Sequence, residues 1–286
     1  MIDVIVVGGG PAGVSAAIYL KRFKLDVTII MKDYGTLGTT DHIENYYGFP
    51  EPISGKELFN NGIKQAKRFE IPVLTEEVLS IDYFDTFTVK TNKGSYESKI
   101  VLLATGASRA TLRVKGFSEY TGKGISFCAV CDGFLYRGKK IGVIGNGDFM
   151  LEELEVLENF SQDITVFTNN MPLEKPLEHV KVVDNKIIEI KGNDVVSSVL
   201  TENSETPIDV LFMAMGTPSA ADFALRMGAF INKNDIVVDE QFMTNIPGLF
   251  AAGDCIGGGW LQIVKAADDG SRAAFAINKY LRKKPM

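Results

Sequence analysis

The chain has 286 residues, of which 45% are hydrophobic and 23% are charged, and its formal net charge is −6. This length allows two compact units, and the composition is that of an ordinary soluble globular protein. No apolar run approaches the roughly 18 residues that a membrane helix needs. The apolar stretch at residues 2–7 is too short for a signal peptide and lacks its basic flank. We therefore expect a cytoplasmic protein that does not bind membranes.

The excess of negative charge lies in the middle of the chain. Residues 110–237 contain 12 Lys and Arg against 18 Asp and Glu, whereas the remainder contains 18 of each class. A protein that binds nucleic acid needs a local cationic surface, and the sequence has no basic stripe. Nucleic acid is therefore disfavoured as a partner.

The N-terminal stretch has the order of a phosphate-binding unit. Residues 3–7 are typical of a buried strand, residues 14–23 of a helix and residues 26–30 of a second strand. The first strand is joined to the helix by Gly8-Gly9-Gly10-Pro11-Ala12-Gly13. Glycines at this spacing let the backbone approach a pyrophosphate at the helix N-terminus, so the sequence predicts a dinucleotide-binding loop.

The end of the second strand departs from this pattern. An acidic residue usually stands there and binds the ribose hydroxyls, but this chain has Met31-Lys32, with Asp33 slightly beyond. We expect the ribose contacts to come from Lys32 or from the backbone.

Further alternation of helix and strand patterns follows. The sequence predicts a helix from about residue 53 to 69, then short strands near 71–74, 77–83, 86–91 and 100–103. Ala104-Thr105-Gly106 closes this set of strands.

A C-x-x-C pair, Cys128 and Cys131, stands near mid-chain and is followed by Asp132. Two thiols at this spacing can close a disulfide ring and exchange it with another disulfide, and a neighbouring carboxyl can move the proton that exchange requires. A zinc site is disfavoured because the chain has only one further cysteine, Cys255, and two histidines. A structural disulfide is disfavoured in a cytoplasmic protein, and two inert buried thiols remain the plain alternative.

Residues 140–167 repeat the strand, glycine loop and helix order in a damaged form. Strands are predicted at 140–144 and 164–167, with a helix from about 151 to 160. Met150 stands where a small residue should allow close helix packing, and Asp148 puts a carboxylate into the loop that should hold phosphate. The second copy therefore predicts a dinucleotide-type fold with a degenerate nucleotide loop.

The last part of the chain returns to the first pattern. Short strands are predicted near 180–183, 186–190, 195–200 and 208–212, and a final helix from about 261 to 281 follows the Gly253-Asp254 pair. We predict an α/β protein of two Rossmann-like, three-layer domains, the second inserted in the first. Their predicted bounds are 1–109 with 238–286 for the outer domain, and 110–237 for the inserted one.

Taken together, these motifs resemble the low-molecular-weight thioredoxin reductases, flavoproteins with two dinucleotide-binding domains. The resemblance runs along essentially the whole chain and implies FAD in the outer domain. By it Cys131 faces the flavin, Cys128 attacks the disulfide of thioredoxin, and Asp132 is the proton donor. The residues that it implies for the FAD site are Gly8, Gly10, Pro11, Ala12, Gly13, Asn45, Ala104, Thr105, Gly106, Gly253, Asp254, Gln262 and Ile263, with Lys32 added from the ribose argument.

One departure from this family bears on the electron donor. Members that use NADPH carry a His-Arg-Arg cluster after the second strand of the inserted domain, where this chain reads Thr168-Asn169-Asn170. Each lost charge-assisted hydrogen bond weakens binding by about 1.5–3 kcal/mol. With Asp148 and Met150 in the glycine loop, the sequence predicts negligible binding of NADPH. The chain thus resembles the ferredoxin-dependent flavin thioredoxin reductases, whose electrons come from an external iron–sulfur protein.

Three alternatives stay open at this point. The same fold could pass electrons outward to oxygen, as flavin dithiol oxidases do, or could use NAD(P)H through an atypical site. It could also be an interaction module without turnover, although the intact cysteine pair argues against this. The family resemblance further implies a homodimer, and no metal site is expected.

Overall fold

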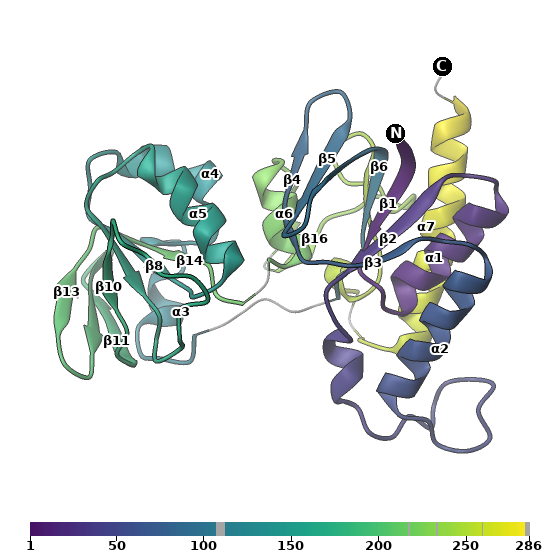
Figure 1. The fold of residues 1–286 in the computed structure, drawn as a ribbon, viewed down its shortest axis with the longest axis horizontal. Coiled ribbons are helices and arrows are strands. Elements are labelled where there is room, and N and C mark those ends of the chain that lie inside the picture. The colour runs from purple at the N-terminus through teal and green to yellow at the C-terminus, as the bar shows by residue number, and fades with distance from the viewer. Residues whose placement is uncertain (107–111, 217, 233, 259, 284–286) are drawn as a thin grey trace. The chain divides into compact units, whose positions relative to one another are not determined.

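In the computed structural model, which describes residues 1–106, 112–216, 218–232, 234–258 and 260–283, the contacts divide the chain into two units. The outer unit comprises Met1–Arg109 and Ser219–Met286, and the central unit is Ala110–Pro218. Figure 1 shows both units.

The outer unit is built on one sheet of seven strands. Its strands are β1 (Ile2–Val7), β2 (Val27–Met31), β3 (Val73–Thr75), β4 (Val78–Tyr83), β5 (Phe87–Thr91), β6 (Ser95–Leu103) and β17 (Leu249–Ala251). The order is β3-β2-β1-β6-β5-β4, with β17 also paired to β6. The pairs of β1 with β2 and β6, of β2 with β3 and of β17 with β6 are parallel, whereas β4 and β5 form an antiparallel extension.

Helices cover the outer sheet because its central strand is apolar on both faces. Val4 and Val6 of β1 pack in a core with α1 (Pro11–Arg22), α2 (Gly55–Arg68) and α7 (Ile263–Lys283), which gather on one side of the sheet in Figure 1. Ile5 and Val7 face a second core that includes α6 (Ala220–Arg226). The smaller elements are η1 (Gly35–Thr39), β15 (Ile231–Asn232), β16 (Asp235–Ile236) and η3 (Asp254–Ile256).

The central unit has a parallel sheet in the order β10-β9-β8-β14-β7. Its strands are β7 (Ile125–Ser126), β8 (Ile141–Ile144), β9 (Ile164–Phe167), β10 (Lys181–Val183) and β14 (Val210–Met213). One face packs against α5 (Asp148–Glu158) and the other against an antiparallel sheet of β11 (Ile187–Gly192), β12 (Val196–Thr201) and β13 (Glu205–Pro207). Three short helical segments complete the unit: α3 (Phe117–Tyr120), α4 (Ala129–Asp132) and η2 (Gly133–Tyr136).

The predicted fold class is therefore confirmed: both units are α/β and carry a parallel sheet between two covering layers. No helix among the described residues is both long enough and apolar enough to cross a membrane.

The position at which the chain returns from the central unit to the outer unit differs from the prediction. It lies between Pro218 and Ser219 rather than between residues 237 and 238. Helix α6 explains the difference, because Ala220, Phe223 and Ala224 are buried in the core of the outer sheet. The predicted first boundary falls within residues 107–111, outside the described residues.

Candidate active site

The predicted cofactor residues of the outer unit follow three neighbouring parallel strands. Gly8 comes after β1, Ala104 after β6 and Gly253 shortly after β17, and β6 pairs with both of the other strands. Since parallel strands end at the same edge of a sheet, the three segments meet there. Backbone hydrogen bonds from Ala104 N to Val7 O (2.8 Å) and from Ala252 N to Leu103 O (2.9 Å) tie them together.

The glycines of the first loop are needed for close approach. Gly8 has φ +118°, and a Cβ on it would collide with the carbonyl oxygen of Ala104. A Cβ on Gly13 would collide with the carbonyl oxygen of Gly8. The strand, the loop and helix α1 are therefore packed backbone to backbone, as a phosphate loop requires.

The N-terminus of α1 is open to an anion. Gly10 is its N-cap residue and supplies no side chain to cap the first turn, and Pro11 occupies the first helical position. Gly9, Gly10 and Pro11 line a cavity of about 770 Å³ that also borders Ile263. The geometry fits the pyrophosphate of a dinucleotide.

Asp254 begins η3, shortly after β17 at this edge of the sheet. Its Oδ1 is buried and has no hydrogen-bond partner among the described residues. Burial raises the pKa of the carboxyl, with Lys265 opposing that shift and Asp269 adding to it. A buried acceptor without a partner is costly, and a cofactor hydroxyl would satisfy it.

Other predicted residues also lie in the outer unit. Asn45 Nδ2 donates to Gln262 Oε1 over 3.0 Å, so the structure brings together two predicted residues that are 217 positions apart. Thr105 Oγ1 accepts from the backbone N of Ala220 (3.1 Å), and Lys32 pairs with Glu77 at 3.0 Å. Thr105 and Lys32 therefore each have a polar partner within the protein. Their contacts with the cofactor stay a prediction.

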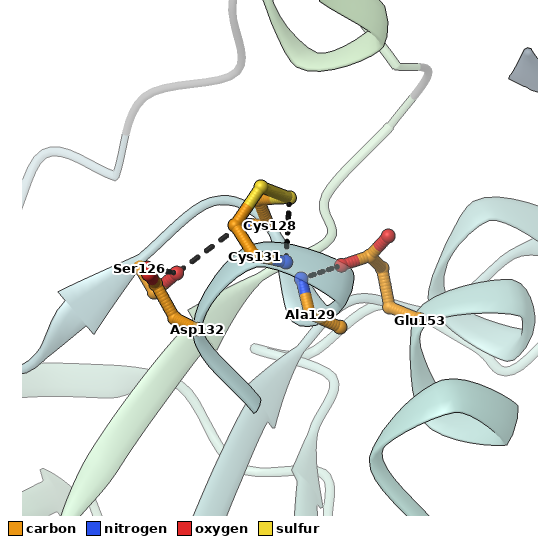
Figure 2. Close-up of a disulfide and its surroundings, with 6 residues drawn as sticks. All are labelled: Ser126, Cys128, Ala129, Cys131, Asp132 and Glu153. Atoms are coloured by element: carbon orange, nitrogen blue, oxygen red, sulfur yellow. Dashed lines mark hydrogen bonds between the residues drawn. A yellow bond between two sulfur atoms is a disulfide. The ribbon is translucent and has the colours of Figure 1, made fainter. Parts of the chain in front are cut away.

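In the central unit Cys128 and Cys131 form a disulfide (Figure 2), with an S–S distance of 2.07 Å and a Cα–Cα distance of 5.2 Å. Cys128 is the N-cap residue of the short helix α4, and the backbone N of Cys131 donates to its Sγ over 3.1 Å. An amide aimed at sulfur stabilises a thiolate once the disulfide opens.

Asp132 lies beside the disulfide and is held by the strand before it. Ser126 Oγ, at the end of β7, donates to Asp132 Oδ2 over 2.6 Å and accepts from the backbone N of Cys128 over 3.2 Å. Figure 2 shows the three residues around one turn. The carboxyl that the sequence predicted as a proton donor is thus linked through one hydroxyl to the backbone of Cys128.

Sequence reasoning missed Glu153, a carboxyl that reaches the same turn from helix α5. Its Oε2 accepts from the backbone N of Ala129 over 2.8 Å. The signal was present, because Glu153 occupies a position between Met150 and Leu157 on the apolar stripe of the helix. A carboxyl in such a stripe indicates a specific partner.

A carboxylate from another part of the central unit lies against the loop after β8, Gly145-Asn146-Gly147. A Cβ on Gly147 would lie 2.9 Å from Glu174 Oε1 and 3.0 Å from Oε2, so this carboxylate stands directly against the loop. Glu174 is held there by its backbone N, which donates to Asn146 O over 2.9 Å. Lys175 pairs with Asp148, the first residue of α5, at 2.6 Å.

The turn after β9 also forms hydrogen bonds within the central unit. Asn169 Oδ1 accepts from the backbone N of Ile187 (2.8 Å), and Asn170 N donates to Asp184 O (2.7 Å). Both asparagines have positive φ, 51° and 64°, as tight turns require. Thr168 is buried, and no arginine or lysine stands in this turn.

The remaining cysteine is not part of this chemistry. Cys255 is a free thiol in the core of the outer unit, and burial raises its pKa to about 12. Among the described residues, no group of three or more His, Cys, Asp and Glu side chains is placed to hold a metal ion.

Comparison with known proteins agrees with these features. Residues 2–270 match the family model described as pyridine nucleotide-disulphide oxidoreductase. Thioredoxin reductase of Aquifex aeolicus is 34% identical over 99% of this chain and 94% of its own, and that of Treponema pallidum is 36% identical over 98% and 97%.

Solved structures give the same result. The atypical thioredoxin reductase TRi from Desulfovibrio vulgaris Hildenborough has a TM-score of 0.91 at 33% identity, with 100% of both chains covered. A ferredoxin-flavin thioredoxin reductase from Clostridium acetobutylicum has a TM-score of 0.74 at 28% identity, with 99% of both chains covered. The open phosphate loop, the unsatisfied Asp254 and the C-x-x-C disulfide are all features that FAD and dithiol chemistry need. The chain belongs to the thioredoxin reductases, the FAD-dependent flavoproteins within the pyridine nucleotide-disulphide oxidoreductases.

Proposed function

We propose that this thioredoxin reductase uses electrons from reduced ferredoxin, rather than from NADPH, to reduce its Cys128–Cys131 disulfide and then the disulfide of thioredoxin. The observation that carries the proposal is the carboxylate of Glu174 against Gly147. In a nucleotide-binding unit, the pyrophosphate lies at this place, between the glycine loop and the N-terminus of the following helix.

Negative charge at this place opposes nucleotide binding in two ways. The Glu174 carboxylate lies next to Gly147, and its charge repels phosphate. Asp148, in the first turn of α5, adds a second carboxylate, which pairs with Lys175. NADH needs the same cradle for its pyrophosphate, so the argument applies to both coenzymes.

The turn after β9 supports the same reading. A 2′-phosphate would need cations there, whereas Asn169 and Asn170 are uncharged and hydrogen-bonded to the start of β11 and to the β10–β11 connection. Losing two charge-assisted bonds would weaken binding by about 3–6 kcal/mol, which is on the order of a hundred- to ten-thousand-fold. The likeness to a protein named ferredoxin-flavin thioredoxin reductase adds support, although the curated relatives carry the plain name thioredoxin reductase.

On the thioredoxin side, exposed apolar side chains lie close to the disulfide in the sequence. Val130, Phe134 and Leu135 are 51%, 57% and 61% exposed, close in sequence to Cys131. Exposed aromatic and aliphatic side chains around a reactive group are suited to docking another protein. We propose that they contact thioredoxin, that Cys128 attacks its disulfide, that Cys131 exchanges electrons with FAD, and that Asp132 supplies the proton.

FAD when bound supplies both one- and two-electron chemistry, which a one-electron donor and a two-electron disulfide together require. The residues that would hold it are those at the ends of β1, β6 and β17, with Asn45, Gln262 and Ile263. We propose that Asp254 accepts from a hydroxyl group of the cofactor.

We also propose that the enzyme is a cytoplasmic homodimer. Away from the phosphate loop, the 770 Å³ cavity runs between α1 and α2, where Val14, Ile18 and Leu58 line it together with the charged residues Arg22, Lys64 and Arg68. Apolar grooves between helices are suited to a second copy of the chain. Light scattering should give twice the chain mass of 31.3 kDa, and a monomer at micromolar concentration would contradict this part of the proposal.

The deciding experiment is an anaerobic titration of the yellow protein with NADPH, NADH and reduced ferredoxin, followed by flavin absorbance. We expect ferredoxin to bleach the flavin and to support reduction of thioredoxin, and both coenzymes to leave it oxidised. Dithionite serves as the control that the flavin can be reduced. Bleaching and turnover with NADPH at micromolar concentration would contradict the proposal, and rapid peroxide formation with a dithiol would favour a dithiol oxidase instead.

A further inference from the structure

Glu153 is a buried carboxyl at a helix position where the sequence pattern predicts an apolar side chain. It is 1% exposed and lies on the same face of α5 as Phe149, Leu154 and Leu157. A carboxyl among apolar side chains is costly unless a specific contact stabilises it. That contact is the backbone N–H of Ala129, 2.8 Å from Glu153 Oε2 (Figure 2).

The Ala129 amide matters because it adjoins Cys128. Amide N–H groups around a C-x-x-C turn stabilise the thiolate of its first cysteine. Here the Cys131 amide donates to Cys128 Sγ over 3.1 Å, but the Ala129 amide donates to Glu153 instead. The carboxyl of Glu153 therefore lies at the peptide unit that directly follows Cys128.

We propose that Glu153 is a positioning residue that sets the reducing strength of the Cys128–Cys131 dithiol. It fixes the Cys128–Ala129 peptide against α5, and its charge opposes formation of the Cys128 thiolate. A dithiol that is less stabilised by ionisation gives up its electrons more readily.

The exchange with thioredoxin is balanced without any further reactant. The two thiols lose two electrons and two protons as the Cys128–Cys131 bond forms, and the thioredoxin disulfide takes up both as its bond breaks. The inference rests on the redox role proposed above for the two cysteines. It does not depend on which molecule donates the electrons.

Two other titratable groups are brought to this turn by the described contacts. Asp132 of α4 is held by Ser126 of β7, and Tyr136 of η2 has a raised pKa because of burial and then because of Asp132. Ala129 also belongs to an apolar core with residues of α5 and of strands β8, β9 and β14. Asp132 and Tyr136 stay unchanged in the variants below, so they contribute equally to each measurement.

The test compares Glu153→Gln with Glu155→Gln, a control on the same helix whose side chain is exposed. Glutamine keeps the shape of Glu153 and an oxygen for the Ala129 amide but removes the charge. In a Cys131→Ser background, the alkylation rate of Cys128 against pH should shift to lower pH by about one unit in Glu153→Gln. With both cysteines present at about pH 8, the equilibrium with glutathione should move about threefold or more toward the dithiol.

Neither shift should occur in Glu155→Gln, and circular dichroism would establish that all variants are folded. Glu153→Ala, which also removes the acceptor, should shift in the same direction. The inference is wrong if Glu153→Gln matches the unmodified protein in both measurements, or if only Glu153→Ala shifts, because the role would then be structural. Neither measurement uses ferredoxin, NADPH or thioredoxin, so failure of the proposed electron donor would be seen separately, in the flavin titration.

Discussion

Ser126 donates its hydroxyl hydrogen to Asp132 Oδ2 over 2.6 Å and so fixes the carboxyl beside the disulfide from the end of strand β7. The same hydroxyl accepts from the backbone N of Cys128. The carboxyl and the cysteine that we propose as proton donor and nucleophile are therefore positioned by a single side chain. Substitution of Asp132 therefore tests proton transfer, and substitution of Ser126 tests positioning.

We expect Asp132→Asn to reduce the rate of thioredoxin reduction by about a hundred- to ten-thousand-fold, because the amide cannot transfer a proton. Its oxygen can still accept from Ser126, so the turn should keep its shape. The measurement is a single turnover from chemically reduced enzyme to oxidised thioredoxin. Ser126→Ala keeps the carboxyl and should lose about tenfold or less. A rate for Asp132→Asn within tenfold of the original would exclude it as the main proton donor.

The two glycines of the central loop should respond differently to alanine. In Gly145→Ala the new Cβ would collide with the backbone oxygen of Ala214, which cannot move freely, so we expect a loss of about 1–3 kcal/mol in the free energy of unfolding. In Gly147→Ala it would meet only the flexible end of Glu174, and the loss should stay below about 1 kcal/mol. Urea denaturation measures both, and equal losses would contradict the placement of Glu174.

Asp254 should destabilise the protein when FAD has been removed. Its pKa is raised in the folded protein, chiefly by burial, so its contribution to stability is present below the ordinary value of 3.8 and is lost as pH rises through the raised value. Asp254→Asn removes this loss, and the FAD-free variant should melt at a higher temperature than the FAD-free original at about pH 7.

The same variant should hold FAD more weakly, because the carboxylate that we propose as a cofactor ligand is gone. Thermal denaturation with and without added FAD gives both results in one series. If the variant melts lower without FAD and binds FAD as tightly as the original, the assignment of Asp254 is wrong.

Cys255 should be unreactive in the folded protein. With a pKa of about 12, almost no thiolate of Cys255 is present at pH 8. Cys128 is equally buried, at 3% exposed, but the Cys131 amide aimed at its sulfur stabilises the thiolate there. After reduction of the disulfide, iodoacetamide should label two cysteines in the native protein and all three in urea, as counted by mass spectrometry. Labelling of Cys255 at a rate similar to that of Cys131 under native conditions would show that the core around it opens.

Elements with a strong local pattern were predictable from the sequence. The strand at 164–167 was predicted with the bounds of β9, and the strand, glycine loop and helix at the N-terminus appear as β1, Gly8–Gly13 and α1. Helix α6 was missed because it is short and apolar, and its signal was the capping box in which Ser219 and Asp222 bond each other's backbone. Missing it moved the predicted domain boundary to residue 237.

The sequence by itself determined which chemical groups are available: a C-x-x-C pair followed by a carboxyl, a complete phosphate loop at one end, and no cations at Asn169 and Asn170. These are local features, since glycine conformation, cysteine spacing and side-chain charge belong to a few adjacent residues. Only the tertiary structure decided what stands against them. Glu153 at the Ala129 amide, Glu174 at Gly147 and Asn45 at Gln262 are contacts between segments whose meeting depends on how sheets and helices pack, which no local pattern specifies.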